Sequence, residues 1–372
     1  MNRSTSRSLR RIAIASLTTL ATACAPGDLS ILGARGIKSA VLRRGHRPPT
    51  ITVSTTAPPT PTTAAPPTTT TDLPTTTTPT AVLPDGAIVF DSDREGGRRV
   101  FVDARDGTAP YSIAADAAYD SFFPRVSPDR RTILFQRTPA GVGDRDYSKV
   151  SIWTVGIDGT GLRLLMGRGS FGWETMGHHE WSPEGTHIAL FGGRLDDPEV
   201  HVVDADGANP RRVTDRPGIG IDPSWSPDGT RIAFVGCAQA VCNPNDYEVF
   251  TVPAGGGTAA RITNDGLRDQ DPYYSATGSE IALVTQDSGS DLLRPWNLRI
   301  AAADGSSVRQ VTSATNAIAG PGHWSPDGRW ILFHRLVLPI TRGFEIYRIH
   351  PDGTGLEIVD TGHGGINEYP TF

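Results

Sequence analysis

The sequence lacks several features that would define common classes of protein. Beyond residue 25, no stretch shows the 3.6-residue apolar period of an amphipathic helix, so a helical fold is excluded. No Gly-x-Ser-x-Gly segment occurs, so an α/β-hydrolase peptidase domain is not expected. The apolar run over residues 12–23 is too short to cross a bilayer as a helix, which needs about 20 residues.

The C-terminal part of the chain also lacks an excess of positive charge. Residues 1–84 hold 9 Lys and Arg residues and 2 acidic residues, whereas the remainder holds 26 and 38. Binding to nucleic acid depends on a basic surface that neutralises phosphates. The sequence therefore predicts no nucleic-acid partner for the C-terminal domain.

What the sequence does contain is a repeated turn. The pentapeptide Trp-Ser-Pro-Asp-Gly stands at residues 225–229 and at 324–328, and related segments begin at residues 126, 181 and 274. Successive copies lie 55, 44, 49 and 50 residues apart, a period typical of propeller blades. Pro suits the second position of a type I turn, and Asp and Gly suit the next two. Each copy therefore predicts a tight reversal between two strands.

The residues between the turns predict the architecture. An apolar run follows each turn, then an alternating segment, a Gly turn and a last short strand, which makes four strands per unit. Apolar runs begin at residues 88, 133, 188, 232, 281 and 331. We therefore expect an all-β fold over residues 85–372, a six-bladed β-propeller of four-stranded antiparallel blades. Residues 369–372 match 222–225, so the C-terminal strand should join the N-terminal blade and close the ring.

The pentapeptide, the apolar run and the Asp-x-Asp-Gly turn together resemble the propeller repeats of the TolB family, which are six-bladed periplasmic proteins. The resemblance covers the whole C-terminal domain and implies the propeller fold. Members of that family carry an α/β domain before the propeller, for which this chain is expected to have no room. The resemblance thus implies an architecture and not a role in a Tol system.

The N-terminal residues predict export. Basic residues precede the apolar run, as in a signal peptide over residues 1–23. Cys24 follows small residues in a segment that resembles a bacterial lipoprotein cleavage box, so we expect a lipid on Cys24. Plain secretion is the alternative. The expected location is the outer face of the cytoplasmic membrane, the periplasm or the cell wall.

Two further segments separate the signal from the propeller. Residues 24–47 form a basic tail, which is either solvated or in contact with anionic lipid headgroups. Residues 48–84 are mainly Thr, Pro and Ala, which cannot form a core, and Pro stiffens such a segment. We interpret them as a disordered linker that serves as a stalk, with O-glycosylation left open. An unselective linker is the alternative.

Two of the three cysteines lie close together in one loop. In an oxidising compartment, Cys237 and Cys242 at this spacing predict a disulfide. A metal site would need further ligands, and the loop offers only Asp246 with Asn243 or Asn245. We therefore expect a disulfide and assign no metal or other cofactor.

The order of strands separates two faces of the ring. The tight turns join first to second and third to fourth strands, so they share one face. Long insertions fall on the opposite face, at residues 136–149, 167–177, 236–246, 286–297 and 335–343. Loops on a rigid scaffold commonly carry binding function. The loop-rich face is therefore the predicted binding face.

Candidate ligand contacts on that face are of three kinds. Trp173 and Trp296 lie in insertions and could stack on a sugar or contact a peptide, or else cover loop cores. The His-His-Glu segment at 178–180, and His323 three blades later, should lie near the channel mouth as ligand contacts or as polar lining. A local metal site of His178 and Glu180 is a minor alternative. Arg145, Arg294 and Arg342 could pair with carboxylates or remain solvated. The first two kinds comprise Trp173, His178, His179, Glu180, Trp296 and His323.

These features predict a non-catalytic binding or scaffold module, a monomer tethered to the cell envelope that recognises a protein or glycan. No paired acid and base can be placed, so no catalytic residue is assigned. The alternative is a metal-dependent polysaccharide lyase acting on uronate oligomers. Lyases of that kind resemble TolB-type propellers, use channel histidines with a divalent metal, and have another blade. A purely structural envelope spacer is the third possibility.

Overall fold

A computed structural model describes residues 81–372, except for 215–218, 240–241, 287–293, 338–342 and 363–364. The signal peptide, Cys24, the basic tail and nearly all of the linker lie outside the described residues, as does Arg342. Export, lipidation and the stalk therefore stay predictions. Within the described ranges, no helix is long and apolar enough to cross a membrane.

Described residues form strands, with three short 3-10 turns between them. Four sheets have four strands each. They are β24 (Asn367–Thr371), β1 (Ile88–Ser92), β2 (Arg99–Asp103) and β3 (Tyr111–Ile113); β4 (Tyr119–Val126), β5 (Thr132–Pro139), β6 (Ser151–Gly156) and β7 (Arg163–Met166); β8 (Thr175–Trp181), β9 (His187–Arg194), β10 (Asp197–Asp204) and β11 (Arg211–Arg212); and β12 (Gly220–Trp225), β13 (Arg231–Cys237), β14 (Tyr247–Pro253) and β15 (Ala260–Arg261). The 3-10 turns are η2 (Tyr147–Lys149), η3 (Ser170–Gly172) and η4 (Pro244–Asp246).

The remaining strands form a single eight-stranded sheet, where the sequence predicted two separate blades. Its strands are β16 (Arg268–Tyr274), β17 (Glu280–Gln286), β18 (Trp296–Ala302), β19 (Val308–Gln310), β20 (Ala317–Trp324), β21 (Ile331–Val337), β22 (Glu345–Ile349) and β23 (Glu357–Ile358). One parallel pair, Trp296 with Ile318, joins the two antiparallel halves. The prediction of six separate blades is therefore correct only in part: the blades are four-stranded and antiparallel, but two of them merge at this pair.

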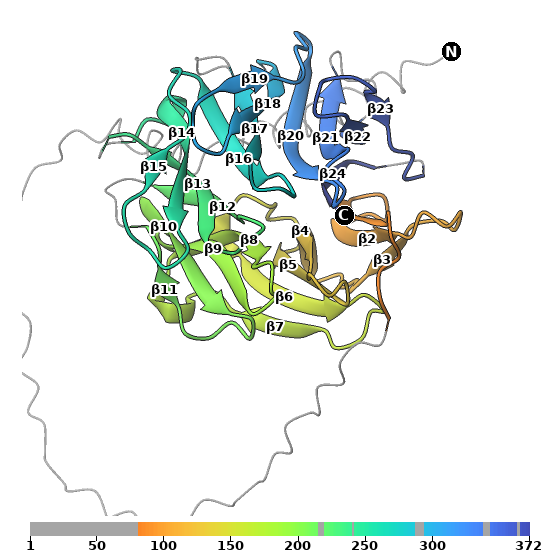
Figure 1. Ribbon diagram of the computed structural model, residues 1–372. Coiled ribbons are helices and arrows are strands. Elements are labelled where there is room, and N and C mark those ends of the chain that lie inside the picture. The colour runs from red at the N-terminus through yellow and green to blue at the C-terminus, as the bar shows by residue number, and fades with distance from the viewer. Residues whose placement is uncertain (1–80, 215–218, 240–241, 287–293, 338–342, 363–364) are drawn as a thin grey trace, which may run out of the picture. The chain divides into compact units, whose positions relative to one another are not determined.

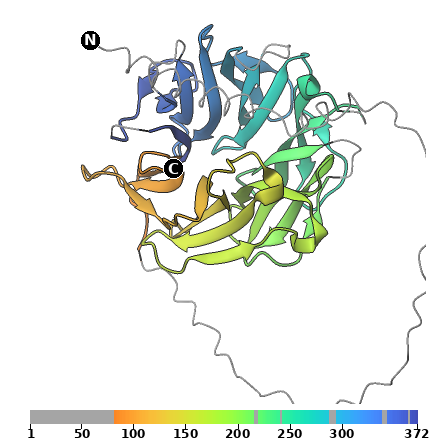
Figure 2. The ribbon, with the colours of Figure 1, turned by 180° about the vertical axis from the view of Figure 1, so that it is seen from behind.

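The sheets stand side by side around a common centre, with β4, β8, β12, β16, β20 and β24 as the inner strands (Figures 1 and 2). The C-terminal strand β24 pairs with β1, as the sequence predicted. Side chains reinforce this junction, because Arg94 donates to the Asn367 side chain at 2.6 Å and lies over the rings of Phe90 and Phe101. The first sheet thus contains strands from both ends of the domain.

The repeated pentapeptide forms the turn expected of it. In the copy at 225–229, the Ser226 hydroxyl donates to Asp228 at 2.6 Å and the Gly229 amide donates to the Ser226 carbonyl at 2.9 Å. Gly229 has a φ of 69°, a conformation that Gly adopts without steric cost. In other copies the Trp reaches across to the neighbouring inner strand: the Trp324 indole donates to the Tyr273 carbonyl at 3.1 Å. The motif therefore shapes the turn and links adjacent inner strands.

Candidate functional site

All six inner strands carry a β-bulge at a similar place, around the channel that these strands enclose, and the pairing with the second strand skips two residues there. In β20 the first skipped residue is Gly320, whereas in the other five strands it is a residue other than Gly with a positive φ. That conformation is costly for residues other than Gly, and such strain often accompanies function. These residues, the bulge layer, are Tyr369 (49°), Phe123 (52°), His178 (42°), Asp222 (51°) and Asp271 (51°).

The bulge layer forms a continuous arc with an aromatic end and an acidic end. The rings of Tyr369 and Phe123 lie 3.7 Å apart between centroids, and those of Phe123 and His178 lie 4.3 Å apart. Beyond them, ligand atoms of His178, Asp222 and Asp271 all lie within 4.8 Å of one another. These residues come from the four four-stranded sheets and from β16 of the eight-stranded sheet, and they lie at one level of the channel.

A cavity of about 550 Å³ lies over the bulge layer. Its walls come from the β1–β2, β5–β6 and β21–β22 loops and from the first residues of several inner strands. These loops each join the second strand of a blade to the third, so the cavity lies on the loop-rich face. Among the described residues, eight acidic residues line it and three arginines do, Arg98, Arg99 and Arg145. A cavity with this balance of charge favours a cationic group.

One of these arginines is already committed to two carboxylates. Arg98 pairs with Asp91 and with Glu368, which lie on the paired strands β1 and β24. Burial raises the pKa of Asp91 well above its usual value, although Arg98 acts against the shift, and burial likewise raises the pKa of Glu368. Burial alone would lower the pKa of Arg98, but the two carboxylates raise it. Arg98 therefore remains charged and holds the closing strand.

The acidic end of the bulge layer has no such partner. Burial raises the pKa of Asp271 to about 7, and the neighbouring Asp222 adds to the shift. Within the described part of the chain, neither aspartate forms an ion pair with an arginine, although the charges of Arg145 and Arg125 act against the rise in the pKa of Asp271. We call Asp222 and Asp271 the acidic pair.

A hydrogen-bonded chain leads to this pair from η2. The Tyr147 hydroxyl lies 2.7 Å from Nε2 of His178, and Nδ1 of His178 contacts Asp222. Burial raises the pKa of Tyr147 well above its usual value, so the hydroxyl keeps its proton. Both ring nitrogens of His178 therefore lie against polar partners.

On the other side of the bulge layer, polar side chains of different inner strands contact one another. Arg125 Nε lies 2.9 Å from Glu180 Oε2, and the guanidinium also donates to the Tyr273 hydroxyl. The ring of Tyr273 packs on His323, with centroids 3.8 Å apart. We call these four residues the closing cluster. Burial lowers the pKa of His323 well below its usual value, so its imidazole is neutral.

The structure distributes the six predicted contacts over four places. His178 and Trp296 line the cavity, whereas Glu180 and His323 belong to the closing cluster. His179 is 2% exposed, and burial lowers its pKa to about 3.

The sixth candidate, Trp173, lies outside the cavity lining, on the flank of its blade. Its ring packs on Gly192 and stands 4.5 Å from His201 between centroids. The suggested metal pair of His178 and Glu180 is split between the cavity and the closing cluster. Of the predicted arginines, Arg145 lines the cavity and Arg294 does not.

The acidic pair and Tyr147 are the cavity residues that sequence reasoning missed. The sequence does contain a signal for Asp222 and Asp271. Both stand just before the Pro of their repeat, the position that Phe123 and Tyr369 occupy in other repeats. At this position the side chain differs in kind from one repeat to the next, while the residues around it stay alike.

A second acidic cluster lies away from the cavity. Ligand atoms of Glu248, Asp265 and Asp269 lie within 4.8 Å of one another. Arg261 pairs with Glu248 at 2.5 Å, and Arg299 pairs with Asp265 at 2.5 Å. Burial raises the pKa of Asp269 to about 7, and Thr285 donates to it at 2.6 Å. Arginine thus supplies the counter-charge here, unlike at the acidic pair.

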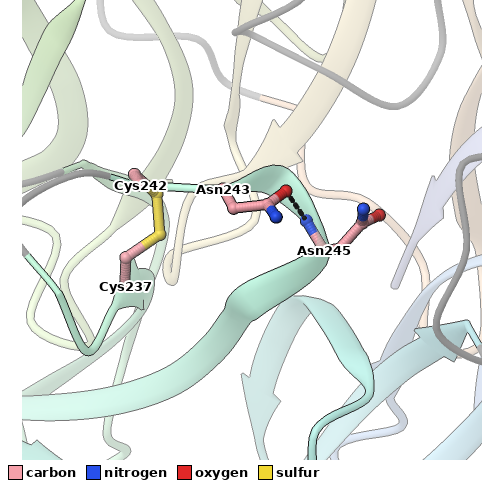
Figure 3. Close-up of a disulfide and its surroundings, with 4 residues drawn as sticks. All are labelled: Cys237, Cys242, Asn243 and Asn245. Carbon is pink, nitrogen blue, oxygen red and sulfur yellow. Dashed lines mark hydrogen bonds between the residues drawn. A yellow bond between two sulfur atoms is a disulfide. The ribbon is translucent and has the colours of Figure 1, made fainter.

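The predicted disulfide is present. Cys237 and Cys242 are bonded, with their Cα atoms 5.6 Å apart (Figure 3). The Asn243 side chain accepts from the Asn245 amide at 3.1 Å in the same loop (Figure 3). Cys237 packs in a cluster with Phe191 and Ile221, both of which line the cavity. The bond therefore braces the β13–β14 loop directly behind one cavity wall.

Comparison with known proteins identifies the repeat. A family model described as the TolB beta propeller domain matches residues 173–353. A Protein TolB homolog from Chlorobium luteolum is 30% identical over 156 residues, which cover 40% of this chain and 31% of the relative. The matched stretch thus spans less than a third of that relative's length.

Solved structures show the same fold. TolB from Acinetobacter baumannii is 18% identical with a TM-score of 0.60, and the match covers 77% of this chain and 66% of that chain. A putative TolB from Agrobacterium tumefaciens is 18% identical with a TM-score of 0.52, over 73% of this chain and 87% of that one. At these identities the likeness shows the fold alone.

Proposed function

We propose that this chain, whose residues 173–353 match the TolB beta propeller domain model, is a non-catalytic module that binds a segment of another protein in the cavity of its loop-rich face. One observation carries the proposal: a 550 Å³ cavity stands over the bulge layer, where strained residues from several blades meet. Ligand sites are commonly concave, partly apolar and built from convergent polar groups.

The closing cluster limits how a ligand can bind. Arg125 binds Glu180 and Tyr273 of other inner strands beyond the bulge layer, so we propose that a ligand enters from the loop-rich face and stops at the bulge layer. A chain end or a protruding side chain suits such a blind cavity. We further propose that the halves of the eight-stranded sheet act as two blades, which gives a monomeric ring of six around this cavity.

A lyase acting on uronate oligomers is the second candidate, and charge argues against it. Each uronate unit carries a carboxylate, and the described residues of the cavity include eight acidic residues and three arginines. Like charges brought together in a poorly solvated site repel each other. Incubation of the purified protein with oligogalacturonate and a divalent metal tests this candidate, since ultraviolet absorbance of an unsaturated uronate product would favour the lyase.

The location follows from the N-terminal residues. We propose that Cys24 is lipidated after export and that residues 48–84 hold the propeller away from the membrane. Palmitate labelling of intact cells should mark the wild type and not Cys24→Ser. Equal labelling of both would contradict the anchor.

The binding role is tested by blocking one face at a time. Ala117 is exposed and lines the cavity, whereas Thr230 is exposed at a tight turn on the opposite face. After crosslinking in cells, Ala117→Trp should recover less of the partner than the wild type, because the indole fills the cavity mouth. Thr230→Trp is the matched control and should leave recovery unchanged. Equal loss or no loss in both variants would overturn the proposal.

A further inference from the structure

We propose that the acidic pair binds a primary ammonium group of the protein ligand, either a lysine side chain or an N-terminal amine. This inference rests on the proposed function and specifies its chemistry. The ammonium would sit at the floor of the cavity, between Asp222 on β12 and Asp271 on β16, beside His178 on β8.

The spacing of the two carboxylates suits one nitrogen. Ligand oxygens of Asp222 and Asp271 lie within 4.8 Å of each other. Charge-assisted N–H···O bonds are about 2.7–2.9 Å long, so a single nitrogen between the oxygens reaches both. An ammonium offers three donors from one point, which fits two separate acceptors better than the planar fork of a guanidinium.

Within the described residues, no arginine or lysine forms an ion pair with the acidic pair. Asp222 is 8% exposed, its contact there is the imidazole of His178, and its Oδ1 has no hydrogen-bond partner. Asp271 makes no hydrogen bond or ion pair in that part of the chain, although the charges of Arg145 and Arg125 act on it. Buried carboxylates are costly without a positive partner. By contrast, Arg261 and Arg299 form ion pairs in the cluster at Glu248, so of the two clusters the acidic pair is the one with room for an added cation.

The surroundings favour an ammonium over a metal ion. Both ring nitrogens of His178 are already engaged, by Tyr147 and Asp222, which leaves two carboxylates as free ligands. Divalent calcium takes about six to eight oxygen ligands, more than this floor provides. The neighbouring wall is aromatic, since Tyr147 and Phe191 line the cavity with their centroids 5.0 Å apart. An alkyl chain ending in an ammonium packs well on aromatic rings.

Small probes test the inference on the full-length protein. The indole N–H of Trp296, a residue that lines the cavity, gives an NMR signal to follow during titration. Nα-acetyl-lysine methylamide represents a side chain, and glycine methylamide represents a chain end. We expect at least one of them to shift this signal saturably near pH 7.5. Nα,Nε-diacetyl-lysine methylamide, which has no charge, should bind at least about tenfold more weakly.

Substitutions assign the effect to the acidic pair. Asp222→Asn and Asp271→Asn should each weaken the better amine at least about tenfold, because each removes half of the negative charge. Asp265→Asn, in the second acidic cluster, is the matched control and should leave binding unchanged. Near-ultraviolet circular dichroism checks that all three fold.

Three results would overturn the inference. They are equal binding of the charged and acetylated lysine probes, unchanged binding in both aspartate variants, and displacement of the amine by Ca²⁺ at micromolar concentration. A failure here is separable from failure of the proposed function. If Ala117→Trp still lowers partner recovery while the amines do not bind, the binding face stands and the ammonium is wrong.

Discussion

The two ends of the central channel are built from the same inner strands and differ in what fills them. Over the bulge layer there is a cavity of about 550 Å³ with many more carboxylates than arginines. Beyond it, Arg125 forms an ion pair with Glu180 and donates a hydrogen bond to the Tyr273 hydroxyl. His178 and Glu180 stand two residues apart in β8 but belong to different ends. The position of a residue relative to the bulge, more than its type, therefore determines whether its side chain lines the cavity.

The largest effect is expected at the closed end. Arg125→Met should lower the free energy of unfolding by about 3 kcal/mol, because it leaves Glu180 partly buried without its cation. Urea denaturation at pH 7 measures this loss. Tyr147→Phe, at the open end, provides the comparison and should cost less. Equal stability of Arg125→Met and wild type would mean that the closing cluster does not hold the channel.

A smaller loss is expected behind the cavity wall. Replacing both Cys237 and Cys242 by Ala should lower the free energy of unfolding by about 2 kcal/mol, because the unfolded chain regains freedom. The same comparison should show faster amide exchange in the β13–β14 loop than at the closing cluster. Unchanged exchange in that loop would contradict a bracing role for the bond.

The open end should respond to pH. Because the pKa of Asp271 is about 7 in the folded protein and about 4 when unfolded, the folded state binds the extra proton between these values. This contribution to stability is complete below about pH 4 and is lost as the pH rises toward 7. Asp222, His178, Arg145 and Arg125 are the charged or titratable groups that act on Asp271.

Asp271→Asn should remove that part of the pH dependence. Urea denaturation at pH 5 and pH 8 should show a smaller fall in stability for the variant than for wild type. Asp269 has a similarly raised pKa in the second cluster, so some fall should remain. Identical slopes for the variant and wild type would contradict the raised pKa of Asp271.

The smallest effect is expected from the hydrogen-bonded chain. Tyr147→Phe removes the hydroxyl that lies against His178 Nε2 and should cost about 1 kcal/mol of stability. The nitrogen chemical shifts of the His178 imidazole should then differ from those of the wild type. An unchanged shift would mean that Tyr147 does not hold this ring.

The fold was largely predictable because its signals are local. The Ser-Pro-Asp-Gly turns and the C-terminal match to the repeat predicted the strands and the pairing of β24 with β1. The merger of two blades was not predictable, since the pair of Trp296 and Ile318 is a contact between blades with no turn or repeat to announce it.

The candidate site was predictable only where a residue breaks the repeat. The segment around His178 is conspicuous because His179 stands where the other copies have Pro, and Trp296 stands in an insertion. Asp222 and Asp271 precede a Pro in copies that keep the usual pattern, so nothing in the repeat marks them. A β-bulge adds a residue and redirects the side chains around it, so the sequence alone does not tell which of two neighbours faces the cavity.

The central claim is that a protein ligand enters from the loop-rich face, and paired photo-crosslinking tests it most directly. A photoreactive residue placed at Ala117, which lines the cavity, should capture a partner in intact cells, whereas one at Thr230 on the opposite face should not. Capture of the same partner from Thr230 and not from Ala117 would contradict the account.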